Sequence, residues 1–137
     1  EGIDEIAAKH PNITLYHFPY EEGITLPKLL LESICVVMPI RKMSIDPQLV
    51  IAETLAAGIP VIATNQRSNP EFIIQNETGA LVPLGDVEAT TAALDSILSD
   101  LDNAARMGRA AKKDIASRWN WNSYADELTE VYESVIR

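Results

Sequence analysis

The chain has 137 residues, of which 47% are hydrophobic and 23% charged, and its formal net charge is −9 at pH 7. A chain of this size forms one globular domain that buries roughly two thirds of its unfolded surface. The acidic balance excludes nucleic-acid binding, which needs clustered Lys and Arg. No apolar run approaches the ~20 residues of a membrane span, and the single Cys35 allows no disulfide framework. We therefore expect a soluble cytoplasmic protein.

The first part of the chain alternates short apolar runs with helical patterns. It begins without Met and with the pattern of a helix end over residues 1–10, so we expect a piece of a longer protein. The alternation predicts an α/β fold with a parallel sheet, right-handed crossovers and one shared carboxyl edge. Strands are predicted at residues 13–18, 35–40, 60–64 and 80–83.

Residues 49–57 predict a helix that is apolar on nearly every side and buried on several faces. Glu53 is the one carboxylate within it. Asp46 followed by Pro47 fits an N-cap and first-turn pair for this helix. The free N–H groups at such a helix start could hold a phosphate. Gly58 is predicted to end the helix.

Three amphipathic helices are predicted after the last strand, at residues 87–98, 101–117 and 121–136, with no strand signal between them. We expect all three to pack over one side of the sheet. Asp86 is the predicted N-cap of the first, and Glu88 in its first turn is favourably placed against the helix dipole.

Ligands of open α/β sheets bind outside the carboxyl ends of the strands. The loops expected at that edge carry cations in a chain that is acidic overall, which indicates an anionic ligand. The alternative is that these charges are simply solvated. The candidate side chains there are Arg41, Lys42, Asp46, Asn65, Gln66 and Arg67.

The stretch "SIDPQLVIAETLAAGIPVIATNQRSNPEFIIQNETGALVPLGD", followed by "ARMGRAAKKDIASRWNWNSYADELTEVYESVI", resembles the carboxyl-terminal donor-binding domain of family 4 (group 1) retaining glycosyltransferases of the GT-B fold. The resemblance covers roughly residues 11–137. It implies a Rossmann-like parallel sheet with flanking helices, three of them at the C-terminal end. Residues 1–137 would be one nucleotide-sugar-binding domain that lacks its first strands.

The family pattern has two glutamates separated by seven residues, one near the donor sugar and one on the ribose hydroxyls. Glu53 matches the second. A carboxylate there can accept two hydrogen bonds from a vicinal diol, each worth ~1.5–3 kcal/mol. The alternative is a carboxylate held by a nearby Arg or by backbone N–H groups.

The chain departs from the pattern at the first glutamate, where it has Ile45. The neighbouring Asp46 either serves the donor sugar from a rearranged loop or caps the helix, and capping is favoured. Glu71 starts a helix at the same edge, and it either lies near the donor or only complements the helix dipole. The catalytic residues stay open, and the predicted donor-binding residues are Glu53, Asp46, Pro47, Gln48, Leu49, Arg41, Asn65, Arg67 and Glu71.

The resemblance implies the donor-binding half of a hexosyltransferase that moves a sugar from a nucleoside diphosphate to a glycan, lipid or other acceptor, as in polysaccharide biosynthesis. It implies no metal and no cofactor besides the nucleotide-sugar substrate. The partner would be a missing N-terminal acceptor domain, and any peripheral membrane association would run through that domain. Without the diphosphate-clamping Arg and Lys expected upstream, the chain alone should be inactive. The alternatives are a degenerate, non-catalytic binding module and another GT-B enzyme such as an epimerase.

Overall fold

A computed structural model describes residues 2–42 and 44–136 of the chain. Its centre is a parallel sheet of three strands in the order β1-β2-β3. The strands are β1 (Val36–Met38), β2 (Val61–Thr64) and β3 (Gly79–Val82). The predicted α/β class with a Rossmann-like parallel sheet is confirmed, and three of the four predicted strands are present to within three residues at either end.

Residues 13–18, predicted as a strand, have no regular secondary structure. Their apolar and β-branched residues fit a strand locally, but β1 pairs only with β2 among the described residues, so no strand lies beside β1 on its other edge. A strand needs a neighbouring strand, because otherwise its backbone N–H and C=O groups have no hydrogen-bond partners. A strand-like sequence does not by itself provide that neighbour.

The side chains of β2 divide between two hydrophobic clusters, because successive residues of a strand point to opposite faces. On one face, Val61 and Ala63 pack against α3 (Leu49–Ala57) and against Phe72 of α4 (Asn69–Phe72). The first cluster consists of Ile51, Leu55, Val61, Ala63, Phe72, Ile73, Ala111 and Ile115. The second, on the opposite face, consists of Ile62, Ala80, Val82, Ile97, Ala104 and Met107.

Helix α5 (Val87–Ser99) covers the face of the second cluster, and α6 (Leu101–Arg118) contributes to both clusters. The start of α5 is capped as predicted, since Asp86 accepts a hydrogen bond from the N–H of Ala89 at 2.8 Å. Asp100 caps α6 in the same way through the N–H of Asn103, at 2.9 Å. The two-sided role of α6 differs from the prediction that all three C-terminal helices share one side of the sheet.

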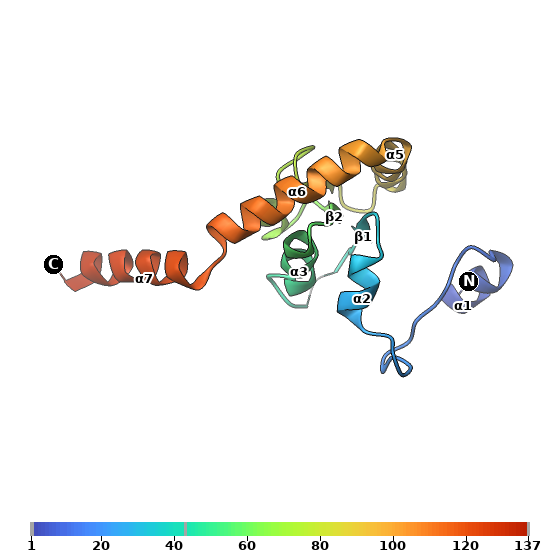
Figure 1. Cartoon of the computed structure of the whole chain (residues 1–137), viewed down its shortest axis with the longest axis horizontal. Coiled ribbons are helices and arrows are strands. Elements are labelled where there is room, and N and C mark those ends of the chain that lie inside the picture. Colours follow the sequence, from blue (N-terminus) through green and yellow to red (C-terminus); the bar gives the residue numbers. More distant parts are fainter. Residues whose placement is uncertain (1, 43, 137) are drawn as a thin grey trace.

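Helix α7 (Trp121–Ile136) has no buried residue and extends from the end of α6 away from the sheet (Figure 1). Helix α1 (Ile3–Lys9), also without a buried residue, lies at the opposite end of the molecule, and α2 (Leu26–Leu31) lies between α1 and the sheet. The prediction that residues 121–136 pack over the sheet is therefore wrong. The amphipathic pattern predicts the helix correctly, but it does not predict what the apolar side of the helix contacts.

Helix α6 crosses the end of α3 at very short range. Gly58 ends α3 in the left-handed conformation, with φ 84°, as predicted for a helix stop. A Cβ atom built on Gly108 of α6 would lie 2.0 Å from the carbonyl oxygen of Gly58. No other residue type fits at position 108 unless the two helices move apart.

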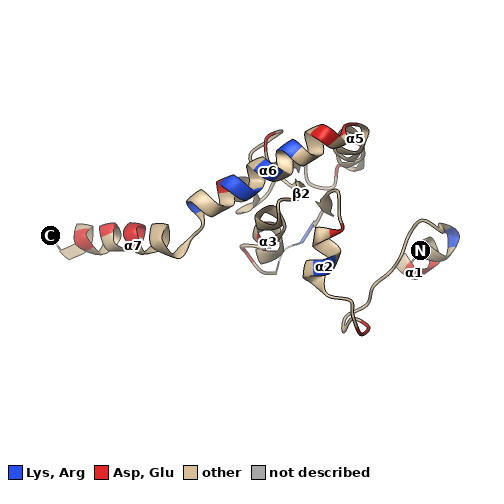
Figure 2. Ribbon diagram, in the orientation of Figure 1, with Lys and Arg blue, Asp and Glu red and all other residues tan. Residues whose placement is uncertain are grey.

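The charges are distributed unevenly over these elements (Figure 2). Helix α6 carries five of the 11 Lys and Arg residues, whereas the charged residues of α7 are all acidic. No helix among the described residues is long and apolar enough to cross a membrane.

Replacing Gly108 by Ala tests the helix crossing. Alanine raises the intrinsic helix propensity by about 1 kcal/mol, but here its methyl group meets backbone, and such overpacking costs roughly 1–3 kcal/mol or more. We expect a net loss of stability, measured as a lower Tm and a lower urea midpoint. Gly2→Ala is the control, because a Cβ there meets nothing within 4 Å. A Gly108→Ala protein as stable as wild type would contradict the close crossing.

Candidate functional site

The carboxyl edge of the sheet faces the start of α3. The chain leaves β1 at this edge, passes through residues 39–48, runs back along α3 and enters β2 at the opposite edge. Gln48 is the N-cap residue of α3, but its side chain makes no capping hydrogen bond, and the first turn contains no acidic residue. Among the described residues, the N–H groups of Leu49 and Val50 have no acceptor. An uncapped helix start of this kind attracts anions.

Hydrogen bonds from side chains and backbone join the loops at this edge. Gln66 donates from its side chain to the carbonyl of Ile40 at 2.5 Å, so the loops after β1 and β2 are tied together. The N–H of Asn65 donates to the carbonyl of Val82 at 2.7 Å, which ties the end of β2 to that of β3. Together with the Asp46 contact described next, they hold the loop before α3 against the loop before α4.

Asp46 does not cap α3, so the favoured prediction is wrong. Its carboxylate accepts a hydrogen bond from the Ser68 hydroxyl at 2.5 Å and a longer one from the Ser68 N–H at 3.4 Å. Helix α3 begins at Leu49, two residues later than an Asp46 cap would require. Ser68, 22 residues away in the sequence, gives this carboxylate its partner instead.

Glu53 lies on the exposed side of α3. The prediction of a helix buried on several faces is wrong, because only Ile51, Thr54 and Leu55 are buried along it. Within the described residues Glu53 has neither an ion pair nor a hydrogen bond. The alternative, a carboxylate held by a nearby Arg or by backbone N–H groups, therefore fails. Glu53 is open to solvent one turn after Leu49, on the same side of the helix.

Arg41 lines a cavity of about 300 Å³ on the α5 side of the edge, together with Pro39, Thr64 and Asp86. A Cβ atom built on Gly85 would lie 3.7 Å from the guanidinium Nε of Arg41. None of the other predicted donor-binding residues lines this cavity. Arg67, Asn65 and Glu71 are exposed in the loop after β2 and in α4.

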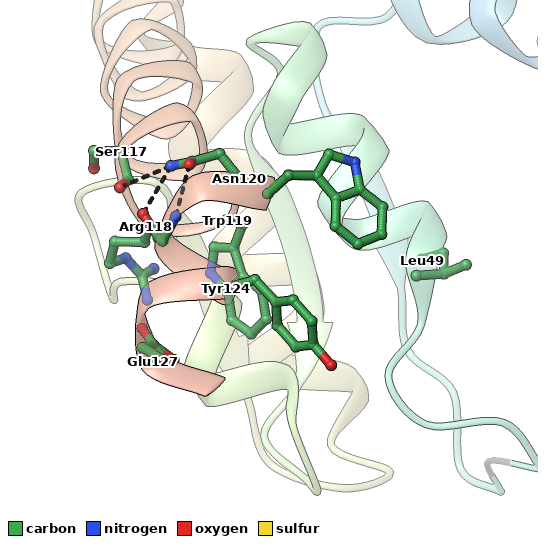
Figure 3. A pocket seen from close by; sticks show the side chains of 9 residues that line it. Leu49, Ser117, Arg118, Trp119, Asn120, Tyr124 and Glu127 are labelled. Atoms are coloured by element: carbon green, nitrogen blue, oxygen red, sulfur yellow. Dashed lines mark hydrogen bonds between the residues drawn. The ribbon is translucent and has the colours of Figure 1, made fainter. Parts of the chain in front are cut away.

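A larger cavity of about 740 Å³ lies between the start of α3 and the junction of α6 with α7 (Figure 3). Leu49 lines one side of it, and Trp119, Trp121 and Tyr124 line the other. Trp119 stacks on the buried Phe72, with ring centroids 4.4 Å apart. Of the predicted residues only Leu49 contributes to this cavity.

Arg118 fixes the α6–α7 junction to the neighbourhood of the predicted site. Its Nη1 donates to the carbonyl of Glu71 at 3.0 Å, and its Nε donates to the Asp114 carboxylate at 2.8 Å. The hydrogen bond to Asp114 raises the pKa of the guanidinium above its ordinary value. Glu71 is thus held through its backbone, while its side chain stays exposed.

Sequence reasoning missed several residues at this edge. Ser68 and Arg118 form contacts between segments 22 and 47 residues apart, for which the sequence gives no local signal. Gln48 Oε1 and Asn69 Oδ1 are buried without a hydrogen-bond donor among the described residues. Asn69 also donates to the carbonyl of Thr64 at 2.8 Å, which positions α4 directly after β2.

The described residues contain no group of three or more His, Cys, Asp or Glu side chains that could hold a metal ion. Burial raises the pKa of the Cys35 thiol, which keeps it protonated and makes it a weak nucleophile. What the edge provides is an uncapped helix start, two exposed arginines in nearby loops, and an exposed carboxylate one turn into the helix.

The curated relatives include glycosyltransferases. The chain is 35% identical over 82 residues, 60% of its length, to a GDP-mannose-dependent alpha-(1-6)-phosphatidylinositol monomannoside mannosyltransferase of Mycobacterium tuberculosis, of which it covers 21%. It is 34% identical over 89 residues, 65% of its length, to a glycogen synthase of the same organism, of which it covers 22%. The chain thus spans about a fifth of the length of these relatives.

Among solved structures, a sucrose-phosphate synthase from Thermosynechococcus elongatus superposes with a TM-score of 0.63 and 30% sequence identity, over 74% of this chain and 25% of that one. This neighbour supports the GT-B type of fold. The family described as "Glycosyl transferases group 1" matches residues 3–114, which is most of the chain. The chain therefore belongs to the group 1 glycosyltransferases.

Proposed function

We propose that this chain is the donor-binding part of a retaining glycosyltransferase and that it binds a nucleoside diphosphate sugar at the carboxyl edge of its sheet. The observation that carries the proposal is the uncapped start of α3, where the N–H groups of Leu49 and Val50 have no acceptor among the described residues. A diphosphate satisfies both the free N–H groups and the positive end of the helix dipole.

The ribose would lie one turn further along α3, beside Glu53. Residues four apart on a helix are neighbours on its surface, so Leu49 and Glu53 share the exposed side of α3. A carboxylate that is free of other partners can accept a hydrogen bond from each hydroxyl of a vicinal diol. Arg41 and Arg67, both exposed, supply positive charge for the diphosphate from neighbouring loops.

The reaction is proposed to transfer a hexose, with its anomeric configuration kept, to a glycan, lipid or other acceptor, in the cytoplasm. The relatives named above act on mannose donors and in glycogen synthesis, which supports the hexose and polysaccharide assignment. The acceptor site would belong to another domain of the protein, because the chain spans only about a fifth of these relatives. No metal is proposed.

A second candidate is a transferase-like module that binds without catalysis. Ile45 occupies the place of the family's first glutamate and is 73% exposed. Asp46, the nearest carboxylate, is engaged by Ser68. The donor-sugar end of the site thus lacks the glutamate, and the nearest carboxylate holds Ser68 through one of its oxygens. The ribose contact proposed for Glu53 does not depend on this loop.

Glu53→Gln is expected to weaken nucleoside diphosphate binding by roughly 1–3 kcal/mol, because a neutral amide offers one acceptor oxygen and accepts more weakly. The Tm should stay within error of wild type, since Glu53 is exposed and has no partner to lose. Calorimetric titration with several nucleoside diphosphates measures the first effect and a thermal melt the second. Glu130→Gln on α7 is the matched control. Unchanged affinity in Glu53→Gln would remove Glu53 from the site.

The isolated chain is expected to bind nucleoside diphosphate but to transfer no sugar, because the acceptor site and the remaining diphosphate contacts would lie outside it. Electrostatic stabilisation of the departing diphosphate is the main requirement of such a reaction. Release of nucleoside diphosphate from a panel of nucleotide-sugars, with and without glycan acceptors, measures this. Sugar transfer above the rate of a boiled sample would contradict the proposal that the acceptor site and the remaining diphosphate contacts lie outside this chain.

A further inference from the structure

Helix α7 exposes a continuous apolar stripe along its whole length. None of its residues is buried, although many of them are large and hydrophobic. The stripe consists of Trp121, Tyr124, Leu128, Val131, Tyr132, Val135 and Ile136, with exposed fractions from 37% to 84%. Figure 1 shows that α7 projects from the end of α6, where no other element of the described chain covers it. The stripe is therefore free to contact another molecule.

The spacing within this stripe is typical of a helix that packs against another helix. Five of its residues are separated alternately by three and four positions, namely Trp121, Tyr124, Leu128, Val131 and Val135. This is the spacing of the core positions of a coiled coil, in which each such side chain inserts between residues of a facing helix. We call these five residues the α7 seam. The partner that matches it is a helix with the same spacing.

The charges of α7 allow a second copy of the same helix to be that partner. The four acids of the helix are Asp126, Glu127, Glu130 and Glu133, and none of their carboxylates forms an ion pair or a hydrogen bond with a described residue. At 3.6 residues per turn, three of these acids lie on the side opposite to the α7 seam, and only Glu127 borders it. Two copies of the seam therefore meet without opposing rows of carboxylates.

We propose that the chain associates as a dimer in which the α7 seams of two copies pack antiparallel. The direction follows from charge complementarity, because α6 carries five cations and two acids whereas the charged residues of α7 are all acidic (Figure 2). In an antiparallel pair, the acidic end of one α7 lies beside the α6–α7 junction of the other copy, and opposite ends of the two helix dipoles lie together. A parallel pair would instead place the like-charged helices of the two copies side by side.

The cavity at the start of α7 also favours this direction. Its volume is about 740 Å³, and the first two residues of the α7 seam, Trp121 and Tyr124, line it together with Leu49 of α3 (Figure 3). In an antiparallel pair, Val135 and Ile136 of the partner subunit reach this cavity. A small side chain of one copy then faces the large Trp121 of the other, which is the arrangement that fills a helix–helix contact best.

The contact is small, so the dimer should be weak. Helix α7 has 16 residues and is therefore ~24 Å long. It contributes the five residues of the seam, whereas a standard protein–protein interface has about 20–30 residues on each side. We therefore expect dissociation in the micromolar range, and not a dimer that persists at nanomolar concentration.

Sedimentation equilibrium of the chain, from micromolar to millimolar concentration, tests the dimer. We expect a monomer–dimer equilibrium in wild type. In the double variant Leu128→Gln, Val131→Gln, at the centre of the α7 seam, the dissociation constant should rise roughly tenfold or more. The matched control Glu130→Gln, Glu133→Gln places the same residue on the opposite side of the same helix, and it should dimerise at least as strongly as wild type. A thermal melt checks that both variants are folded.

Cysteine cross-linking tests the direction, in a Cys35→Ala background that removes the one native thiol. A mixture of Trp121→Cys and Val135→Cys proteins should form a mixed disulfide on mild oxidation. Trp121→Cys alone should not, because a disulfide needs Cα atoms within about 7 Å of each other. Leu128→Cys, at the middle of the α7 seam, should cross-link in either direction and is the positive control.

A chain that stays monomeric up to millimolar concentration would overturn the proposal, and the apolar stripe would then belong to a contact with a different protein segment. So would a dimer that the Leu128→Gln, Val131→Gln variant does not weaken, since association would then use another surface, such as an edge of the sheet. Cross-linking of Trp121→Cys with itself would show a parallel pair and would overturn the antiparallel arrangement.

Discussion

Helix α6 reaches the end of α3 only because Gly108 carries no side chain where it meets the carbonyl of Gly58. This contact allows one helix to contribute to the hydrophobic clusters on both faces of a narrow sheet: Ala104 and Met107 to one, Ala111 and Ile115 to the other. With three strands of three or four residues, the sheet buries little by itself. The packing of α6 therefore fixes α3, and α3 carries the proposed donor site at its opposite end.

The proposed site depends on that rigidity because its main element is backbone. Free N–H groups at a helix start bind a diphosphate well only when the helix is fixed relative to the loops around it. Hydrogen bonds from Gln66 to Ile40 and from Ser68 to Asp46 hold these loops in place. Side chains would then add specificity. In the proposal Glu53 accepts hydrogen bonds from the ribose hydroxyls, and Arg41 and Arg67 balance the negative charge of the diphosphate.

The sequence was sufficient where the signal is local. The caps of α5 by Asp86 and of α3 by Gly58 were predicted, because each depends on a residue type at a helix end. It was insufficient where the deciding partner lies far along the chain. Asp46 bonds to Ser68 rather than capping, and residues 13–18 lack a strand to pair with. The exposure of Glu53 was missed because alanines in α3 look apolar whether or not they are buried.

Amide hydrogen exchange with and without a saturating nucleoside diphosphate tests the central claim most directly, since it reports on the backbone groups themselves. The account predicts slower exchange at Leu49 and Val50 and in the loop of residues 65–68, with little change along α7. Protection confined to the α6–α7 junction around Trp119 and Trp121, with none at the start of α3, would contradict it. In that case the larger cavity, and not the helix start, would be the nucleotide site.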